Sequence, residues 1–279
     1  MGICSRQSST VIRAISLLRS YRTIQPSGAT ARCQRTSRVD TGYRYTLSWP
    51  RIRRKKVDAA AAIALWWIVF AAAHSLPAHP PLRARLIRAL GKRGYLAAYC
   101  AAALVAFVFL VRTFWAARHT GAPLWALGAV PGVRAAAIAV DLLAFALLAA
   151  ALVSPSPVSL AGGRPEARGL MKLTRHPLFM AMAMWGGAHA AMNGYPPDVV
   201  FFGGFFAYGV LGAAHQDYRK RLVEADRFAD FYRQTSLLPL GAVVTGRTRL
   251  SARELPWLAF LLGLIMGIGI YRLHPMLFW

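Results

Sequence analysis

From Asp58 to the C-terminus, long apolar segments alternate with short polar ones. Each apolar segment has the length of about 20 residues that a helix needs to cross a hydrocarbon core of roughly 30 Å. Lipid offers no hydrogen-bond partner to backbone N–H and C=O groups, so such segments must be helical. The pattern therefore predicts an all-α fold, a polytopic membrane helix bundle of about six transmembrane helices. The predicted spans are 58–77, 94–114, 134–153, 174–193, 198–216 and 255–273.

The polar segments predict how these helices are connected. The Asn-Gly-Tyr-Pro-Pro sequence at 193–197 predicts a tight turn, so the fourth and fifth helices should form an antiparallel hairpin. Segment 217–254 begins with apolar residues spaced among charges, which predicts an amphipathic segment lying on the cytoplasmic surface. In the last span, Gly263 and Gly267 form a weak signal for close helix packing.

The distribution of Lys and Arg predicts the orientation in the membrane. The first, third and fifth connections are rich in both residues, whereas the opposite side carries only Arg118. Positively charged loops stay in the cytoplasm, so these three connections are predicted to face it. The expected location is a bacterial inner membrane.

Residues 1–57 differ in composition from the rest of the chain. Residues 1–56 hold 13 Lys and Arg and one acid, a net charge of +12 that would itself prefer the cytoplasm. We interpret 1–57 as a basic presequence or an upstream extension outside the membrane domain at 58–279. If it is a transit peptide, the membrane is organellar. A nucleic-acid-binding arm is the disfavoured alternative, because the tract has no recognition motif and no interleaved aromatic residues.

Composition excludes several other classes. The chain is 56% hydrophobic and 16% charged, against about 25% charged for a typical soluble domain. Its three cysteines show no CxxC spacing, which excludes a disulfide framework. The bilayer is thus the predicted partner, and no nucleic acid is expected.

Two of the seven histidines, His74 and His189, lie within apolar segments, where ionisable side chains usually mark a site. Each follows an aromatic or Met residue at helical spacing. Two interpretations are open: hydrogen bonds between helices, or axial ligation of a haem iron. A zinc site is disfavoured because no further ligands accompany them. Asp141, the acid deepest in a span, is expected to pair with Arg134 or with a neighbouring helix.

The Arg175-His176-Pro177 sequence opens the fourth predicted span. Proline suits the first turn of a helix. Arg175 at the cytoplasmic interface would hold an anionic headgroup or a haem propionate, or it would extend its charge to water as helix-end arginines do. An Arg-His-Pro sequence also occurs in membrane methyltransferases that use S-adenosylmethionine, which gives a third functional interpretation.

Several motifs together resemble the NnrU family of integral membrane proteins. The matching motifs are Ala73-His74-Ser75, Arg118-His119-Thr120-Gly121, Leu173-Thr174-Arg175-His176-Pro177, Ala188-His189, Thr235-Ser236-Leu237-Leu238-Pro239 and His274-Pro275. The resemblance implies haem b held by His74 and His189, with His176 and Arg175 as further cofactor-binding candidates. It also implies isomerase activity on an apolar, carotenoid-like substrate. The alternative is a non-catalytic membrane component that supports expression or assembly of nitrite and nitric oxide reductases.

Helix geometry tests this ligand pair. At 1.5 Å per residue, His74 lies roughly 6 Å and His189 about 18 Å from the inner membrane boundary. The offset of about 12 Å is too large for one iron, unless the fourth helix begins about two turns lower or is tilted.

Overall fold

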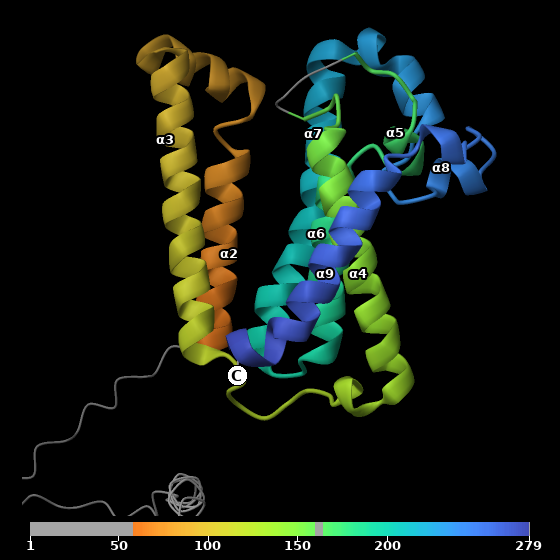
Figure 1. The fold of residues 1–279 in the computed structure, drawn as a ribbon. Coiled ribbons are helices and arrows are strands. Elements are labelled where there is room, and N and C mark those ends of the chain that lie inside the picture. Colours follow the sequence, from red (N-terminus) through yellow and green to blue (C-terminus); the bar gives the residue numbers. More distant parts are fainter. Residues whose placement is uncertain (1–57, 160–163, 279) are drawn as a thin grey trace, which may run out of the picture. The chain divides into compact units, whose positions relative to one another are not determined.

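The computed structural model describes residues 58–159 and 164–278; the predictions for residues 1–57 lie outside these ranges. Six long helices follow the six apolar segments (Figure 1): α2 (Ala59–Ser75), α3 (Pro80–Ala117), α4 (Pro131–Val153), α6 (Pro177–Met192), α7 (Pro196–Gln234) and α9 (Trp257–Phe278). Short helical turns lie in the connections: η1 (Leu127–Ala129), α5 (Leu170–Leu173), α8 (Gly241–Val244) and η2 (Ala252–Glu254). No strand occurs in the described ranges, so the predicted all-α class is confirmed.

The long helices have the length and surface of a membrane bundle. Four of them, α3, α4, α7 and α9, are long and apolar enough to cross a bilayer. The other two are shorter, with 17 residues in α2 and 16 in α6. Large apolar side chains such as Leu104, Leu152 and Ile265 point outward and are more than half exposed. Such a surface is stable only against lipid or another apolar partner.

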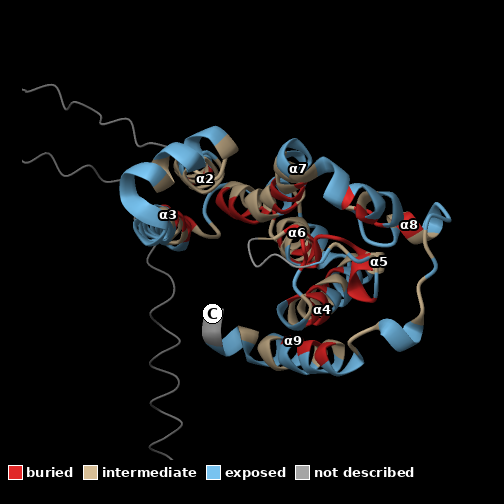
Figure 2. Cartoon of the chain, turned by 90° about the horizontal axis from the view of Figure 1, so that it is seen from above, coloured by how far each residue is buried: buried red, intermediate tan, exposed pale blue. Residues whose placement is uncertain are grey.

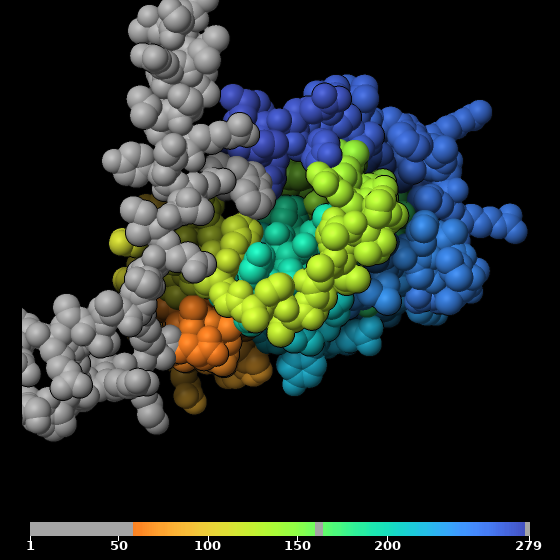
Figure 3. All heavy atoms as spheres, turned by 90° about the horizontal axis from the view of Figure 1, so that it is seen from below, coloured from red at the N-terminus to blue at the C-terminus, as the bar shows by residue number. Residues whose placement is uncertain are grey.

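Each helix packs on the next in the order α3, α2, α7, α6, α4, α9 (Figures 1 and 2). The α6–α7 pair forms the predicted antiparallel hairpin. We call the end of the bundle with the α2–α3 turn and the C-terminal part of α7 the basic end. It is the predicted cytoplasmic side. At the opposite end, the connection from α3 to α4 passes across the end of α6 (Figure 3).

Two helices extend beyond their predicted spans. The basic connection after the first span is helical and continuous with α3, which bends at Gly91, where φ is +70°. Glycine adopts this conformation without steric cost, so the bend falls there. The predicted cytoplasmic amphipathic segment begins as the continuation of α7, with a kink at Glu224. Charged surface helices thus join the membrane helices directly.

The fourth membrane helix begins later than predicted. Residues Thr174–His176 are not helical, and α6 starts at Pro177 instead of residue 174. The residue before a proline is disfavoured in the helical region, and His176 has φ −125° and ψ 59°. The helix therefore starts at the proline, and the preceding residues are free to make other contacts.

Glycines set the close helix contacts of the bundle. A Cβ on Gly263 would lie 2.4 Å from the Phe145 carbonyl oxygen of α4, and one on Gly267 would lie 3.1 Å from the Phe145 Cβ. The predicted packing role of these two glycines is confirmed. On α7, a Cβ on Gly204 would lie 2.1 Å from the Trp67 ring of α2, whereas Gly203 has open space.

The neighbouring glycines of α7 give a matched prediction. Gly204→Ala should lower the free energy of unfolding by about 1–3 kcal/mol, because the added methyl group displaces Trp67. Gly203→Ala should be neutral or stabilising by up to about 1 kcal/mol through helix propensity. Thermal unfolding of the full-length protein in detergent measures both. Equal transition midpoints for the two variants would show that Trp67 does not pack closely on α7.

Candidate functional site

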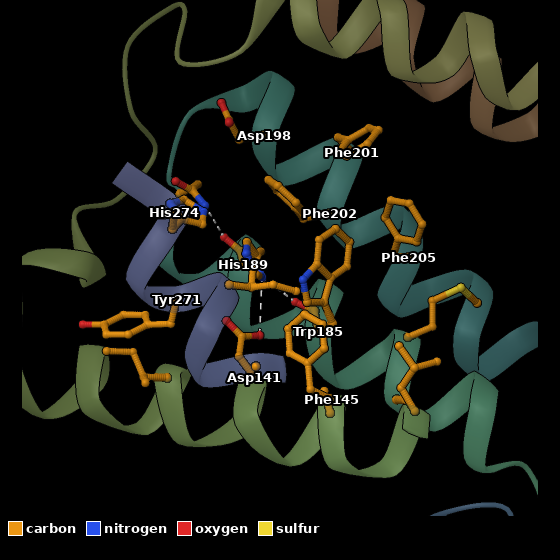
Figure 4. Close-up of a pocket in the computed structure, with 18 of the residues that line it drawn as sticks. Asp141, Phe145, Trp185, His189, Asp198, Phe201, Phe202, Phe205, Tyr271 and His274 are labelled. Carbon is orange, nitrogen blue, oxygen red and sulfur yellow. Dashed lines mark hydrogen bonds and ion pairs between the residues drawn. The ribbon is translucent and has the colours of Figure 1, made fainter. Parts of the chain in front are cut away.

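A cavity of about 590 Å³ lies between α3, α4, α6, α7 and α9. This volume is within the range of small-molecule sites, about 300–1,000 Å³. Most of its walls are aromatic and aliphatic side chains, including Trp185, Phe202 and Phe205 (Figure 4). A minority of the lining residues are polar: Arg118, His119, Asp141, His189, Asn193, Asp198 and His274. The cavity therefore suits an apolar ligand that also meets a few polar groups.

His189 lies in the last turn of α6, and its ring is oriented by a hydrogen bond to one carbonyl and a nearby carboxylate. Its Nδ1 is 3.0 Å from the carbonyl oxygen of Trp185 and 3.4 Å from Oδ1 of Asp141 on α4. A carbonyl and a carboxylate only accept hydrogen bonds, so Nδ1 carries the proton. When the ring is neutral, Nε2 keeps its lone pair. A histidine that binds a metal is oriented in this way by its other nitrogen.

Aromatic rings surround the His189 imidazole. Its centroid lies 4.6 Å from that of Trp185 and 4.9 Å from that of Phe202. The His274 ring of α9 approaches to 6.5 Å and lines the same cavity. The contact between α9 and α4 brings His274 to this position. His274 was part of a sequence motif, but its place beside His189 depends on helix packing that the sequence pattern does not specify.

A second polar pair at the cavity joins α3 to α7. The backbone N–H of His119 donates to Oδ2 of Asp198 at 2.8 Å, and the His119 Nδ1 is 3.2 Å from Oδ1. Asp198 is fully buried in the first turn of α7, where the helix dipole favours a negative charge. Asp198 is not among the site residues predicted from the sequence. Its position directly after two prolines that begin a helix is the sequence feature that could have pointed to it.

His74 lies outside the residues that line this cavity. Its ring packs against Phe70, Tyr99 and Tyr208, and its Nδ1 is buried without a hydrogen-bond partner. His74 contacts Tyr208 of α7, and His189 contacts Phe202 of the same helix. Tyr208 and Phe202 are about 9 Å apart along the helix axis at 1.5 Å per residue.

Two imidazole nitrogens on one metal ion lie about 4 Å apart, because each bond is about 2 Å long. The structure therefore does not bring the predicted pair, His74 and His189, together around one ion. A chain of ring contacts lies between the two histidines: Phe70 and Trp67 of α2, Phe205 of α7 and Trp185 of α6.

Arg175 and His176 also lie apart from the cavity, at the basic end. Asp217 of α7 accepts from the Arg175 Nε at 2.7 Å and from the His176 Nε2 at 2.7 Å. A further Arg175 N–H donates to the Thr235 carbonyl oxygen. The two side chains are 8% and 2% exposed. They connect the start of α6 to α7, so neither is free for a headgroup, a propionate or a surface cofactor.

The fold and cavity together define a class, a polytopic all-α membrane protein with a histidine-bearing apolar site. A family model described as "NnrU protein" matches residues 62–279. The chain belongs to the NnrU family.

Curated relatives add detail to this assignment. The chain is 26% identical over 217 residues to a 15-cis-zeta-carotene isomerase, chloroplastic, of Arabidopsis thaliana, covering 75% of this chain and 58% of that protein. It is 26% identical over 243 residues to the protein of the same name from Zea mays, covering 80% and 64%. The chain thus spans about three fifths of the length of these relatives. No solved structure matches it significantly.

Proposed function

We propose that this protein binds haem b through His189 and isomerises a double bond of an apolar, carotenoid-like substrate in the cavity. The observation that carries the proposal is the orientation of His189, whose Nδ1 contacts the Trp185 carbonyl and Asp141, within an apolar cavity of about 590 Å³. The relationship to proteins named zeta-carotene isomerases supports the reaction class. We propose the bacterial inner membrane as its location, or an organellar membrane if residues 1–57 are a transit peptide.

His189 fits the requirements of a haem ligand. It keeps a lone pair on Nε2, and its Nδ1 proton is held by Trp185 and Asp141. The porphyrin itself supplies four ligands to the iron, so the protein needs to add only one or two. A bound haem would supply a Lewis-acidic, redox-active iron at this position.

Two histidines are candidates for the second ligand. His274 shares the cavity with His189, at a centroid distance of 6.5 Å. His74, which the family resemblance implies, has an unpartnered Nδ1 but lies beyond Trp67 and Phe205. Use of His74 therefore requires α2 to move against α7, whereas use of His274 does not.

The remaining residues of the cavity have binding roles. Phe201, Phe202 and Phe205 present aromatic surface that holds a hydrocarbon chain and excludes water. Asp141 and the Trp185 carbonyl prevent rotation of the His189 ring. The methyltransferase interpretation is not taken further, because Arg175 and His176 are buried and bonded to Asp217.

An isomerisation assay tests this function. Purified full-length protein, reconstituted with haem, is incubated with 15-cis-zeta-carotene, and the isomers are separated by chromatography. We expect conversion by the unaltered protein and at least a tenfold lower rate for His189→Ala, since ligand and second-shell changes cost about 10–100-fold. His215→Ala, on α7 outside the cavity lining, is the matched control. Haem-loaded protein that converts no substrate would contradict the enzyme proposal and favour the non-catalytic role.

A further inference from the structure

A second polar cluster, at the basic end between α2, α3 and α7, is not used by the proposed function. Its centre is Arg219 of α7, which donates an Nη1–H to the Ala78 carbonyl oxygen at 2.7 Å. The Arg219 Nε is buried and has no hydrogen-bond partner. Buried polar atoms are normally satisfied, so this unpartnered donor indicates a missing ligand.

The surroundings of Arg219 contain no carboxylate among the groups that act on its charge. After burial, these groups are Tyr99, Tyr95, Arg83 and Tyr208. Within the described ranges, no carboxylate forms an ion pair with Arg219. Partly buried cations elsewhere have such partners: Arg175 pairs with Asp217, and Lys172 pairs with Glu254. A buried charge is costly unless it is paired.

The neighbouring hydroxyl groups do not supply the missing acceptor. Tyr95 and Tyr99 donate to the carbonyl oxygens of Pro77 and His74, at 3.1 and 3.0 Å. Like the Arg219 hydrogen bond, these two hydrogen bonds are accepted by backbone carbonyl oxygens at and just beyond the C-terminal end of α2. A guanidinium has five N–H donors, and this contact uses one of them. No described residue accepts from the other N–H groups, so the guanidinium can bind an oxygen from outside the chain through them.

We propose that Arg219 binds an anionic phosphate group at the basic end of the bundle, with a phospholipid headgroup as its source. Arg219 follows the predicted span 198–216 by three residues, and Arg83 lies in the exposed start of α3. Both are thus at the membrane boundary, where headgroups lie. A guanidinium matches phosphate through paired hydrogen bonds, and basic residues next to a membrane helix attract anionic lipid. The proposal does not depend on haem or on isomerase activity.

Lipid retention by the full-length protein tests the site. Delipidated protein is titrated with phosphatidylglycerol, phosphatidylcholine or inorganic phosphate, and bound ligand is counted by native mass spectrometry. Arg219→Gln should weaken phosphatidylglycerol binding at least tenfold. Arg219→Lys, which keeps the charge but loses the planar donor set, should fall between Arg219→Gln and the unaltered protein. Arg168→Gln, which removes an equally charged but exposed side chain, should bind as the unaltered protein does.

Ligand-linked stability separates binding from a structural role. Phosphatidylglycerol should raise the melting temperature of the unaltered protein, and Arg219→Gln should lose this increase whatever its own melting temperature. If Arg219→Gln does not fold, Arg83→Gln provides the test, because Arg83 is exposed and its loss should still weaken binding. Inorganic phosphate that binds at the same site without lipid would identify a small-anion site. The proposal would be overturned if Arg219→Gln bound lipid and phosphate as well as Arg168→Gln does. If Arg219→Gln does not fold, the same comparison is made between Arg83→Gln and Arg168→Gln.

Discussion

Asp217→Ala is expected to lower the free energy of unfolding by about 3–5 kcal/mol, the cost of breaking a buried ion pair. Asp217 is 6% exposed and accepts hydrogen bonds from both Arg175 and His176. Its removal leaves a buried guanidinium without a counter-charge and a buried imidazole without a partner. The contact between the start of α6 and the C-terminal part of α7 should loosen first. Unfolding of the full-length protein in mixed micelles, followed by tryptophan fluorescence, measures the change.

An exposed ion pair at the same end serves as the control. Arg168 and Glu166 lie 3.4 Å apart with side chains 82% and 47% exposed. Glu166→Gln should therefore change stability by no more than about 1 kcal/mol. If Asp217→Ala and Glu166→Gln have the same effect, the Asp217 network does not hold the helices together. Arg175 and His176 would then regain their place as cofactor-binding candidates.

Removal of the His189 imidazole is expected to reduce haem affinity about 100-fold or more. The basis is that even groups that only orient a metal ligand are worth about 10–100-fold. Asp141→Asn should give a smaller loss of about tenfold, because the Trp185 carbonyl still accepts the Nδ1 proton. Haem bound per chain, measured after titration with haemin, gives both values. Unchanged affinity in His189→Ala would contradict the assignment of this residue as the ligand.

Two further variants identify the second ligand. If His274→Ala changes the iron from six- to five-coordinate, the cavity pair seen in the structure binds the haem. If His74→Ala does so instead, α2 closes against α7 when haem binds. His215→Ala removes an imidazole that does not line the cavity and should leave coordination unchanged.

The architecture was predictable because the bilayer imposes a simple rule. Backbone groups in lipid must be paired within a helix, so an apolar segment of about 20 residues specifies one membrane helix. The Asn193–Pro197 turn likewise fixed the α6–α7 hairpin through local conformation. The late start of α6 was less predictable, because it depends on His176 leaving the helix to contact Asp217.

Partners of the polar side chains could not be predicted from local sequence. Asp217 is 41 residues from His176, and nothing in the spacing indicates that the two meet. Asp141 was expected to pair with Arg134 or with another helix, and the structure selects His189 of α6. The sequence therefore predicts His189 as a site residue, but helix packing determines its partners.

The same limit applies to His74. Helix rise alone predicted a depth offset of about 12 Å from His189, and the contacts on α7 give about 9 Å. Both values leave the two rings too far apart for one iron in this conformation.

The most direct test of the account is the reduced-minus-oxidised absorption spectrum of the full-length protein after reconstitution with haemin. The account predicts the Soret and α bands of a histidine-ligated b-type haem, and their loss in His189→Ala but not in His215→Ala. A reconstituted protein without a Soret band, or identical spectra for the unaltered protein and His189→Ala, would contradict the central claim that His189 holds a haem in the apolar cavity.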